Sequence, residues 1–272
     1  MYRGPGFIKF LFIYFSPLVM LIRTWFVLFS LAGSLLALPV QAAQAQVQVA
    51  VASNFAAPMQ DIAALFEQAT GHKAMVVLGS TGKLATQVRH GAPFDVLLAA
   101  DSRTPTLLAA EGLAVAGSQF TYAQGQLALY STQPGLVDAQ GAVLAGPLPG
   151  KLAVADARLA PYGAAAAQVL AALGLTAAVR PHLVVGENIG QTFQFVKTGN
   201  AALGFVALSQ IMVGGKISSG SAWVIPSKLY NPIRQDAVLL KTGENNPAAT
   251  ALLQYLRGDS ARQVIGAYGY QF

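Results

Sequence analysis

The chain alternates between short apolar runs and longer stretches in which apolar residues recur every three or four positions. The run 47–51 (VQVAV) predicts a buried strand, and the spacing over 59–69 predicts a helix that ends at Gly71. Further apolar runs predict strands at 74–78, 94–99, 126–130, 151–155, 183–185, 203–208, 223–225 and 237–240. Helical spacing predicts helices at 83–90, 102–111, 164–173, 191–197, 247–256 and 260–267. This alternation is typical of an α/β fold with a largely parallel sheet.

The order of these elements indicates two α/β lobes within one chain. The rhythm of strand and helix changes near Gly125, and no low-complexity linker divides the chain. We expect the chain to cross between the lobes twice, near 122–127 and 224–232. The first lobe is predicted to hold 46–124 with 230–272, and the second lobe 125–229.

The first 45 residues have a different pattern. They hold two apolar runs, 7–22 and 25–39, three basic residues and no acid, and they end in small residues (PVQAAQA). A basic residue, an apolar run and a small-residue end are typical of a secretory signal peptide. Met20 is an alternative start, which would make 1–19 an upstream extension. We expect an exported, soluble mature chain; the alternative is a retained membrane anchor.

Composition limits the function classes further. The 272 residues include 17 Lys or Arg, 11 Asp or Glu and no Cys, and 54% are hydrophobic. This composition excludes a disordered chain, a disulfide scaffold and thiolate chemistry. Three of the basic residues lie in the leader, so the remaining body carries a net charge of about +3 without a Lys/Arg cluster. Nucleic-acid binding is therefore not indicated.

Motifs for catalysis or metal binding are weak. His72, His90 and His182 lie far apart, and neither HExxH nor GxSxG occurs. The run 79–84 (GSTGKL) resembles a phosphate loop but has Leu84 where the motif needs Ser or Thr. We expect no catalytic residue, no cofactor and no direct protein–metal ligand.

Two carboxylates flank one predicted strand and leave an enzyme as an alternative. Asp95 and Asp101 stand on either side of 96–100 and have the residue type of an acid/base pair. The other interpretation is a strand-end residue and a helix cap.

Four predicted strand-to-helix junctions carry small or polar residues. They are Ser53-Asn54, Ser80-Thr81-Gly82, Pro161-Tyr162-Gly163 and Asn188-Ile189-Gly190. The first N–H groups of a helix lack partners inside it and give its N-terminus a partial positive charge. Ligands of open α/β sheets bind at the carboxyl ends of strands. Two junctions from each lobe predict a cleft that encloses a small oxyanion with neutral donors.

The chain resembles the molybdate-binding proteins of bacterial ABC importers over nearly all of 46–272. The segments that carry the resemblance include AVASNFAAPMQDIAALFEQATGH, GAPFDVLLAAD, APYG followed by GEN, and the ending AYGYQF. The resemblance implies a type II periplasmic-binding-protein fold, with two α/β lobes, a hinge and an anion cleft between the lobes. It also implies a monomer in the periplasm that delivers its ligand to a membrane permease with a cytoplasmic ATPase.

The resemblance also implies the anion-binding residues. Ser53 and Asn54 match the first turn, through hydroxyl, amide and backbone N–H, and Thr81 with Ser80 beside it matches the second. Tyr162 matches the third contact. The fourth contact matches Ile189, through its backbone N–H, with Asn188 adjacent.

One strand departs from the family pattern. Many members carry a ligand tyrosine in a GIVY-like strand, whereas this chain reads GFVA and ends in Ala207. We therefore expect Tyr162 to supply a phenolic donor as well as its N–H.

The donor set suits a fully ionised anion. Molybdate and tungstate only accept hydrogen bonds at neutral pH, whereas the proton of hydrogen phosphate needs an acceptor. None of the matched positions is acidic. A sulfate, thiosulfate or phosphate binder of the same fold remains an alternative. So do an exported enzyme that acts on a small anionic metabolite and a membrane-tethered or regulatory protein.

Overall fold

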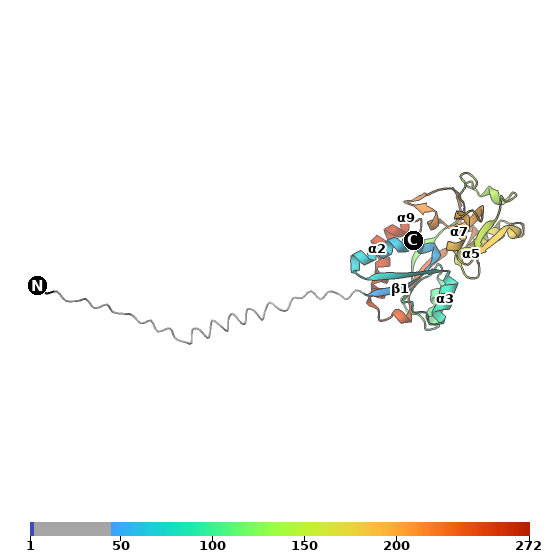
Figure 1. The fold of residues 1–272 in the computed structure, drawn as a ribbon. Helices are drawn as coiled ribbons and strands as arrows, with labels where there is room; N and C mark the ends of the chain where they lie inside the picture. Colours follow the sequence, from blue (N-terminus) through green and yellow to red (C-terminus); the bar gives the residue numbers. More distant parts are fainter. Residues whose placement is uncertain (3–44) are drawn as a thin grey trace. The chain divides into compact units, whose positions relative to one another are not determined.

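The structure is a computed structural model that describes residues 1–2 and 45–272. The predicted leader, with both apolar runs and the candidate start at Met20, lies outside the described residues except at its two ends. Among the helices that are described, none is long and apolar enough to cross a membrane. Residues 45–272 belong to one compact unit, shown in Figure 1.

The first sheet has the strand order β2-β1-β3-β12-β4. Its strands are β1 (Gln46–Ala52), β2 (Lys73–Gly79), β3 (Val96–Leu98), β4 (Phe120–Gly125) and β12 (Ile233–Leu239). Strand β1 is parallel to β2 and β3, whereas β12 is antiparallel to β3 and β4. Five helices accompany this sheet: α2 (Ala56–Thr70), α3 (Thr81–Arg89), α4 (Arg103–Ala110), α8 (Pro247–Arg257) and α9 (Asp259–Ala267).

Strand β1 is buried on both faces because helices cover both sides of the sheet. Val47, Val49 and Val51 pack with α2, α8 and α9, whereas Ala50 packs with α3 and α4. Successive side chains of a strand point to opposite faces, so a doubly covered strand reads as a continuous apolar run. This explains why the pattern VQVAV predicted the strand correctly.

The second sheet has the strand order β11-β5-β8-β6-β7. Its strands are β5 (Leu127–Ser131), β6 (Leu152–Ala155), β7 (Leu183–Gly186), β8 (Leu203–Ala207) and β11 (Ser221–Val224). Strand β6 is parallel to β7 and β8, and β5 is antiparallel to β8 and β11. Helix α5 (Pro161–Ala172) packs on one face of this sheet and α7 (Ile189–Lys197) on the other, with the short α6 (Thr176–Val179) after α5.

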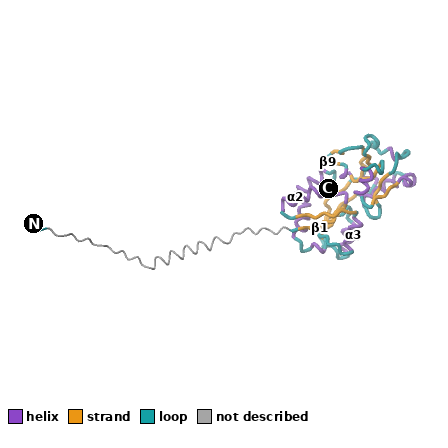
Figure 2. The backbone as a smooth tube through the Cα atoms, viewed as in Figure 1, coloured by secondary structure: helices purple, strands orange, loops and turns teal. Residues whose placement is uncertain are grey.

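The two sheets define two lobes. The first lobe is the first sheet with α2, α3, α4, α8 and α9, and the second lobe is the second sheet with α5, α6 and α7. Figure 2 shows the strands, and Figure 1 shows α5 and α7 at the end of the unit away from α2. The chain enters the second lobe between β4 and β5 and returns between β11 and β12.

The prediction of a largely parallel sheet is wrong, because both sheets are mixed. The sequence did not predict strand β4, nor the short hairpin of β9 (Met212–Val213) and β10 (Lys216–Ile217). Strand β12 begins four residues before its predicted start. The early part of β12 reads IRQD, and its Gln235 and Asp236 are buried. Buried polar side chains with hydrogen-bond partners hide a strand from a pattern based on hydrophobicity.

Candidate functional site

The carboxyl ends of four strands meet between the lobes. Strands β1 and β2 of the first lobe end at Ala52 and Gly79, and β6 and β7 of the second lobe end at Ala155 and Gly186. The segments that follow surround a small cavity of about 10 Å³. All seven residues predicted to bind the anion line this cavity: Ser53, Asn54, Ser80, Thr81, Tyr162, Asn188 and Ile189.

The turn after β1 offers fewer side-chain donors than the sequence suggested. The Ser53 hydroxyl donates to the Gly79 carbonyl at 3.0 Å. The Asn54 amide nitrogen donates to Gln235 Oε1 at 2.8 Å and to the Tyr270 hydroxyl at 2.9 Å. Both amide protons of Asn54 are therefore used inside the protein, so its predicted amide contact with the anion is not available in this arrangement. The N–H groups of the first helical turn remain.

The turn after β2 holds the most available hydroxyl groups. Ser80 is buried, and its Oγ has no hydrogen-bond partner within the described part of the chain. Thr81 Oγ1 accepts a bond from the Ala100 N–H at 3.0 Å, so its own proton remains free to donate. A buried hydroxyl without a partner costs about 1–3 kcal/mol. The orphaned Ser80 hydroxyl therefore indicates a ligand that accepts a hydrogen bond.

Tyr162 connects the start of α5 with buried residues of the first lobe. Its phenolic oxygen accepts a bond from Gln235 Nε2 at 3.0 Å and lies against Gly125, at the end of β4. The phenol thus belongs to a buried cluster beside the cavity. Helix α5 begins with Pro161, which is favoured at the first helical position, and Tyr162 follows in the first turn. Helix α5 begins at the cavity with its N-terminal backbone, and Tyr162 lines the cavity. Because the phenolic oxygen accepts from Gln235, the hydroxyl keeps its own proton to donate, so the expected phenolic donor stays a prediction.

Two hydrogen bonds fix the turn after β7 and the start of α7. Asn188 caps α7, because its Oδ1 accepts the Gln191 N–H at 2.9 Å. Ile189 is the first residue of α7, and its carbonyl accepts a bond from Gln210 Nε2 at 3.0 Å. Helix α7 is thereby fixed with its N-terminus at the cavity. The N–H of Ile189 belongs to the first helical turn and lacks a partner inside the helix.

The cavity favours negative charge without carrying a cation. No acidic and no basic side chain is found among the described residues that line it. Helices α3, α5 and α7 and the turn before α2 begin there, and each helix N-terminus contributes a partial positive charge. Nowhere in the described chain do three His, Cys, Asp or Glu gather into a metal-binding group. The arrangement can hold a small anion by hydrogen bonds, and it offers no general base.

Asp95 and Asp101 do not form a pair. They flank β3 at opposite ends, so the strand separates them. Asp95 accepts the Gln48 N–H at 2.6 Å, near the start of β1. Asp101 accepts the Thr104 N–H at 2.6 Å, and burial raises the pKa of its carboxyl group. Both carboxylates accept backbone N–H groups, which matches the interpretation as a strand-end residue and a helix cap.

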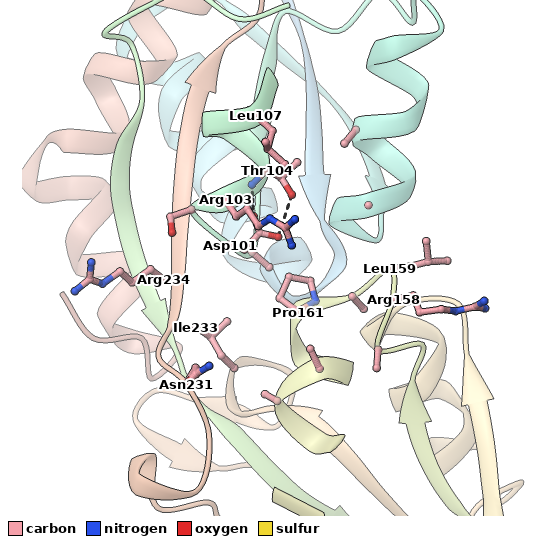
Figure 3. A pocket seen from close by; sticks show the side chains of 18 of the residues that line it. Asp101, Arg103, Thr104, Leu107, Arg158, Leu159, Pro161, Asn231, Ile233 and Arg234 are labelled. Atoms are coloured by element: carbon pink, nitrogen blue, oxygen red, sulfur yellow. Dashed lines mark hydrogen bonds between the residues drawn. The ribbon is translucent and has the colours of Figure 1, made fainter. Parts of the chain in front are cut away.

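A larger cavity of about 550 Å³ lies beside the first (Figure 3). Both cavities are lined by Ala100, Ala160 and Pro161. Arginines from both lobes line the larger cavity: Arg89, Arg103, Arg158 and Arg234. None of the seven predicted residues is among its described lining. It is a basic cleft whose arginine side chains are long and exposed, whereas neutral donors line the smaller cavity.

The lobes touch around the smaller cavity, so the structure is a closed form. The Gly82 N–H donates to the Leu159 carbonyl at 2.9 Å. Lys83 pairs with Glu187 at 2.6 Å, with both side chains about half exposed. Behind the cavity, Ser209, which follows β8, donates to the Asn54 carbonyl at 2.9 Å. These contacts exist only while the lobes are together.

We predict that Gly82→Ala weakens anion binding without weakening the fold. A Cβ at Gly82 would lie 3.1 Å from the Leu159 carbonyl oxygen and 3.2 Å from its Cα, which is tight for backbone neighbours in the other lobe. Within α3, alanine is favoured over glycine by about 1 kcal/mol. Calorimetric titration and thermal unfolding of the ligand-free variant separate the two effects. Unchanged affinity would show that the lobes need not approach this closely.

Sequence reasoning missed the cluster behind the cavity. Tyr122, Tyr162, Tyr270 and Gln235 are buried together with Asn54, although they are far apart in the chain. The ending AYGYQF contains Tyr270 and was one of the resemblance segments, but no local pattern placed it near Asn54. Burial raises the pKa of Tyr270 to about 12 and those of Tyr122 and Tyr162 well above 10.

We predict that stability falls above pH 10 because of this cluster. Unfolded tyrosine ionises near pH 10, whereas Tyr270 in the folded protein keeps its proton to about pH 12. Between these values the unfolded state binds fewer protons than the folded state, so the free energy of unfolding decreases as the pH rises. Below pH 10 tyrosine is protonated in both states, so the protein keeps the full stability at these pH values. Urea unfolding at pH 9, 10 and 11 measures the free energy of unfolding at each pH. Equal values at all three would contradict this prediction.

Known proteins resemble this chain in sequence and structure. A family model described as bacterial extracellular solute-binding protein matches residues 47–271. Two curated relatives named molybdate-binding protein ModA are similar over most of their length. The one from Azotobacter vinelandii is 57% identical, over 89% of this chain and 95% of its own. The one from Rhodobacter capsulatus is 48% identical, over 86% of this chain and 91% of its own.

A solved structure shares the fold. The periplasmic molybdate-binding protein of Azotobacter vinelandii superposes with a TM-score of 0.80 at 39% identity, covering 83% of this chain and 99% of that chain. The predicted resemblance and the predicted two-lobe fold are both confirmed.

Proposed function

Because the chain belongs to the bacterial extracellular solute-binding proteins and to the molybdate-binding family within them, we propose that it binds molybdate in the cavity between its lobes. Tungstate, an ionised oxyanion of the same shape and charge, is the expected second ligand. The metal enters only as the oxyanion, without a protein–metal bond. The protein acts by binding and delivery, not by catalysis.

The observation that carries this proposal is the buried Ser80 hydroxyl in a cavity that offers donors and no carboxylate. Thr81 adds a free hydroxyl proton, and the helix N-termini add backbone N–H groups. A dianion that only accepts hydrogen bonds satisfies all of these donors. Each hydrogen bond to an ionised group contributes about 1.5–3 kcal/mol.

Closure of the lobes explains capture and release. The anion contacts turns from both lobes, so it binds the closed form more tightly than the open form and shifts the population towards closure. We propose that the closed form delivers its ligand in the periplasm to a membrane permease with a cytoplasmic ATPase. The leader would be removed on export, and the protein would act as a monomer.

The test is calorimetric titration of residues 46–272 after removal of bound anions. We expect tight 1:1 binding of molybdate that persists in excess sulfate and phosphate. Saturation by sulfate or phosphate, with no heat from molybdate, would keep the fold and overturn the ligand. No heat from any of these anions would contradict the oxyanion site.

Ser80→Ala is expected to change affinity and stability in opposite directions. The ligand-free protein loses a buried hydroxyl without a partner, so its free energy of unfolding should rise by up to about 1 kcal/mol. Molybdate binding should weaken about tenfold or more, because a charge-assisted hydrogen bond is lost. Ser53→Ala is the matched comparison: the Ser53 proton already bonds Gly79, so its loss should weaken binding less. If Ser80→Ala changed neither quantity, Ser80 would not be a ligand.

A further inference from the structure

Gln235 connects the two lobes behind the cavity. It lies on β12 of the first lobe, and its side chain is fully buried. Its Oε1 accepts bonds from Asn54 Nδ2 at 2.8 Å and from the Tyr122 hydroxyl at 3.0 Å, both in the first lobe. Its Nε2 donates to the Tyr162 hydroxyl at 3.0 Å, in the second lobe.

The Gln235 amide bonds one residue of the first lobe and one of the second, and both of these residues belong to turns that line the cavity. Asn54 stands in the turn that follows β1, and Tyr162 stands in the first turn of α5. A single side chain thus holds one turn from each lobe. With Asn54 Nδ2 as the donor, Gln235 Oε1 is the acceptor, and Gln235 Nε2 faces the Tyr162 hydroxyl.

The local backbone is built around this amide. The pairing of β12 with β4 shifts between Gln235 and Asp236 and leaves Tyr122 unpaired in the register. Such a bulge re-aims nearby side chains, and here the Tyr122 hydroxyl reaches Gln235. Gly125, where the chain leaves the first lobe, has no room for a Cβ, because Tyr162 and Gln235 lie directly against it. The bond between the lobes thus lies beside the chain crossing.

We propose that Gln235 is a positioning residue for the anion: its amide holds the Asn54 turn and the start of α5 in the relative orientation in which both face one ligand. This inference rests on the proposed function. Gln235 is not among the residues that line the cavity, so the proposed role is to act through Asn54 and Tyr162. Through its bonds to Asn54 and to Tyr162, the side chain of Gln235 joins both turns. If the bond to Tyr162 is lost, the Gln235 side chain no longer connects the Asn54 turn with the start of α5.

Three variants test the role. Tyr162→Phe removes the bond between the lobes while it keeps the ring and the backbone N–H. Gln235→Met removes the whole amide at similar volume. Tyr122→Phe is the control, because it removes a bond to the same Oε1 within one lobe. We expect the first two to weaken molybdate binding about tenfold through faster release, and the control to change it less than about twofold.

A double-mutant cycle separates positioning from stability. If the amide acts through Tyr162, the combined variant should bind no more weakly than Gln235→Met alone. Equal effects of Tyr162→Phe and Tyr122→Phe, or fully additive effects of Tyr162→Phe and Gln235→Met, would overturn the proposal. If wild-type protein bound no molybdate in the same titration, the proposed function would fail instead.

The distance between the lobes supplies a readout that general destabilisation does not move. The chain has no Cys, so spin labels on introduced Cys residues at Gln68 of α2 and Gln194 of α7, both exposed, are unique. With saturating molybdate, wild type and Tyr122→Phe should give one narrow distance. Tyr162→Phe should give a broader or longer distribution, and a narrow wild-type distribution for this variant would contradict the proposal.

Discussion

Asn188→Asp is expected to abolish molybdate binding while the protein remains folded. Asn188 lines the cavity and caps α7, and aspartate caps helices as well as asparagine does. The helix N-terminus stabilises the new carboxylate in its charged form. At an effective dielectric constant of 20, two unit charges 4 Å apart repel by about 4 kcal/mol, and molybdate carries two charges. Affinity should fall by more than about 1,000-fold in calorimetric titration.

Asn188→Ser is the matched control for this charge. Serine keeps a capping oxygen without a charge, so its affinity should stay within about threefold of wild type. Thermal unfolding of ligand-free Asn188→Asp should occur at or slightly above the wild-type temperature, because the carboxylate lies at a helix N-terminus. Retained binding by Asn188→Asp would place the anion elsewhere, and the larger basic cleft would then be the next candidate.

Ile189→Pro is expected to weaken molybdate binding about 100-fold. Proline removes the backbone N–H without breaking the helix, because Ile189 is the first residue of α7, where proline is favoured. The preceding Asn188 has φ −146° and ψ 171°, an extended conformation that tolerates a following proline. The lost bond is charge-assisted and contributes about 1.5–3 kcal/mol, and the proline ring also takes space near the anion.

Ile189→Ala separates the N–H from side-chain packing. Ile189 is buried, so both variants lose packing, but alanine loses more of the side chain and keeps the N–H. Molybdate affinity should fall strongly for proline and by less than about threefold for alanine, with both measured by titration at equal thermal stability. Similar losses in both variants would show that the side chain, not the N–H, matters at this position.

The locations of the candidate site residues could be predicted because they depend on local order. Ser53, Ser80, Tyr162 and Asn188 each follow a strand or open a helix, and the carboxyl ends of parallel strands meet at one edge of a sheet. The structure brings all seven predicted residues to one cavity. That they bind molybdate remains a proposal, which the variants above test.

The roles of individual polar atoms could not be predicted in the same way. The Asn54 amide and the Tyr162 phenol are bonded to Gln235, which is distant from both in sequence. The Ser53 proton is bonded to Gly79, whereas the Ser80 hydroxyl lacks a partner. A donor is available to a ligand only if no protein acceptor lies closer, and that depends on the packing of segments that the chain order does not bring together.

The α/β class, most of the helices and strands, the two-lobe family and the four turns of the site could therefore be predicted from the chain alone, because periodicity, helix caps and motif segments are local. The mixed sheets, the buried polar start of β12 and the hydroxyl groups that remain free in the cavity became clear only from the folded protein. They depend on contacts between segments that are distant in the chain, such as Asn54 with Gln235, and their energies depend on which polar groups burial brings within hydrogen-bond distance.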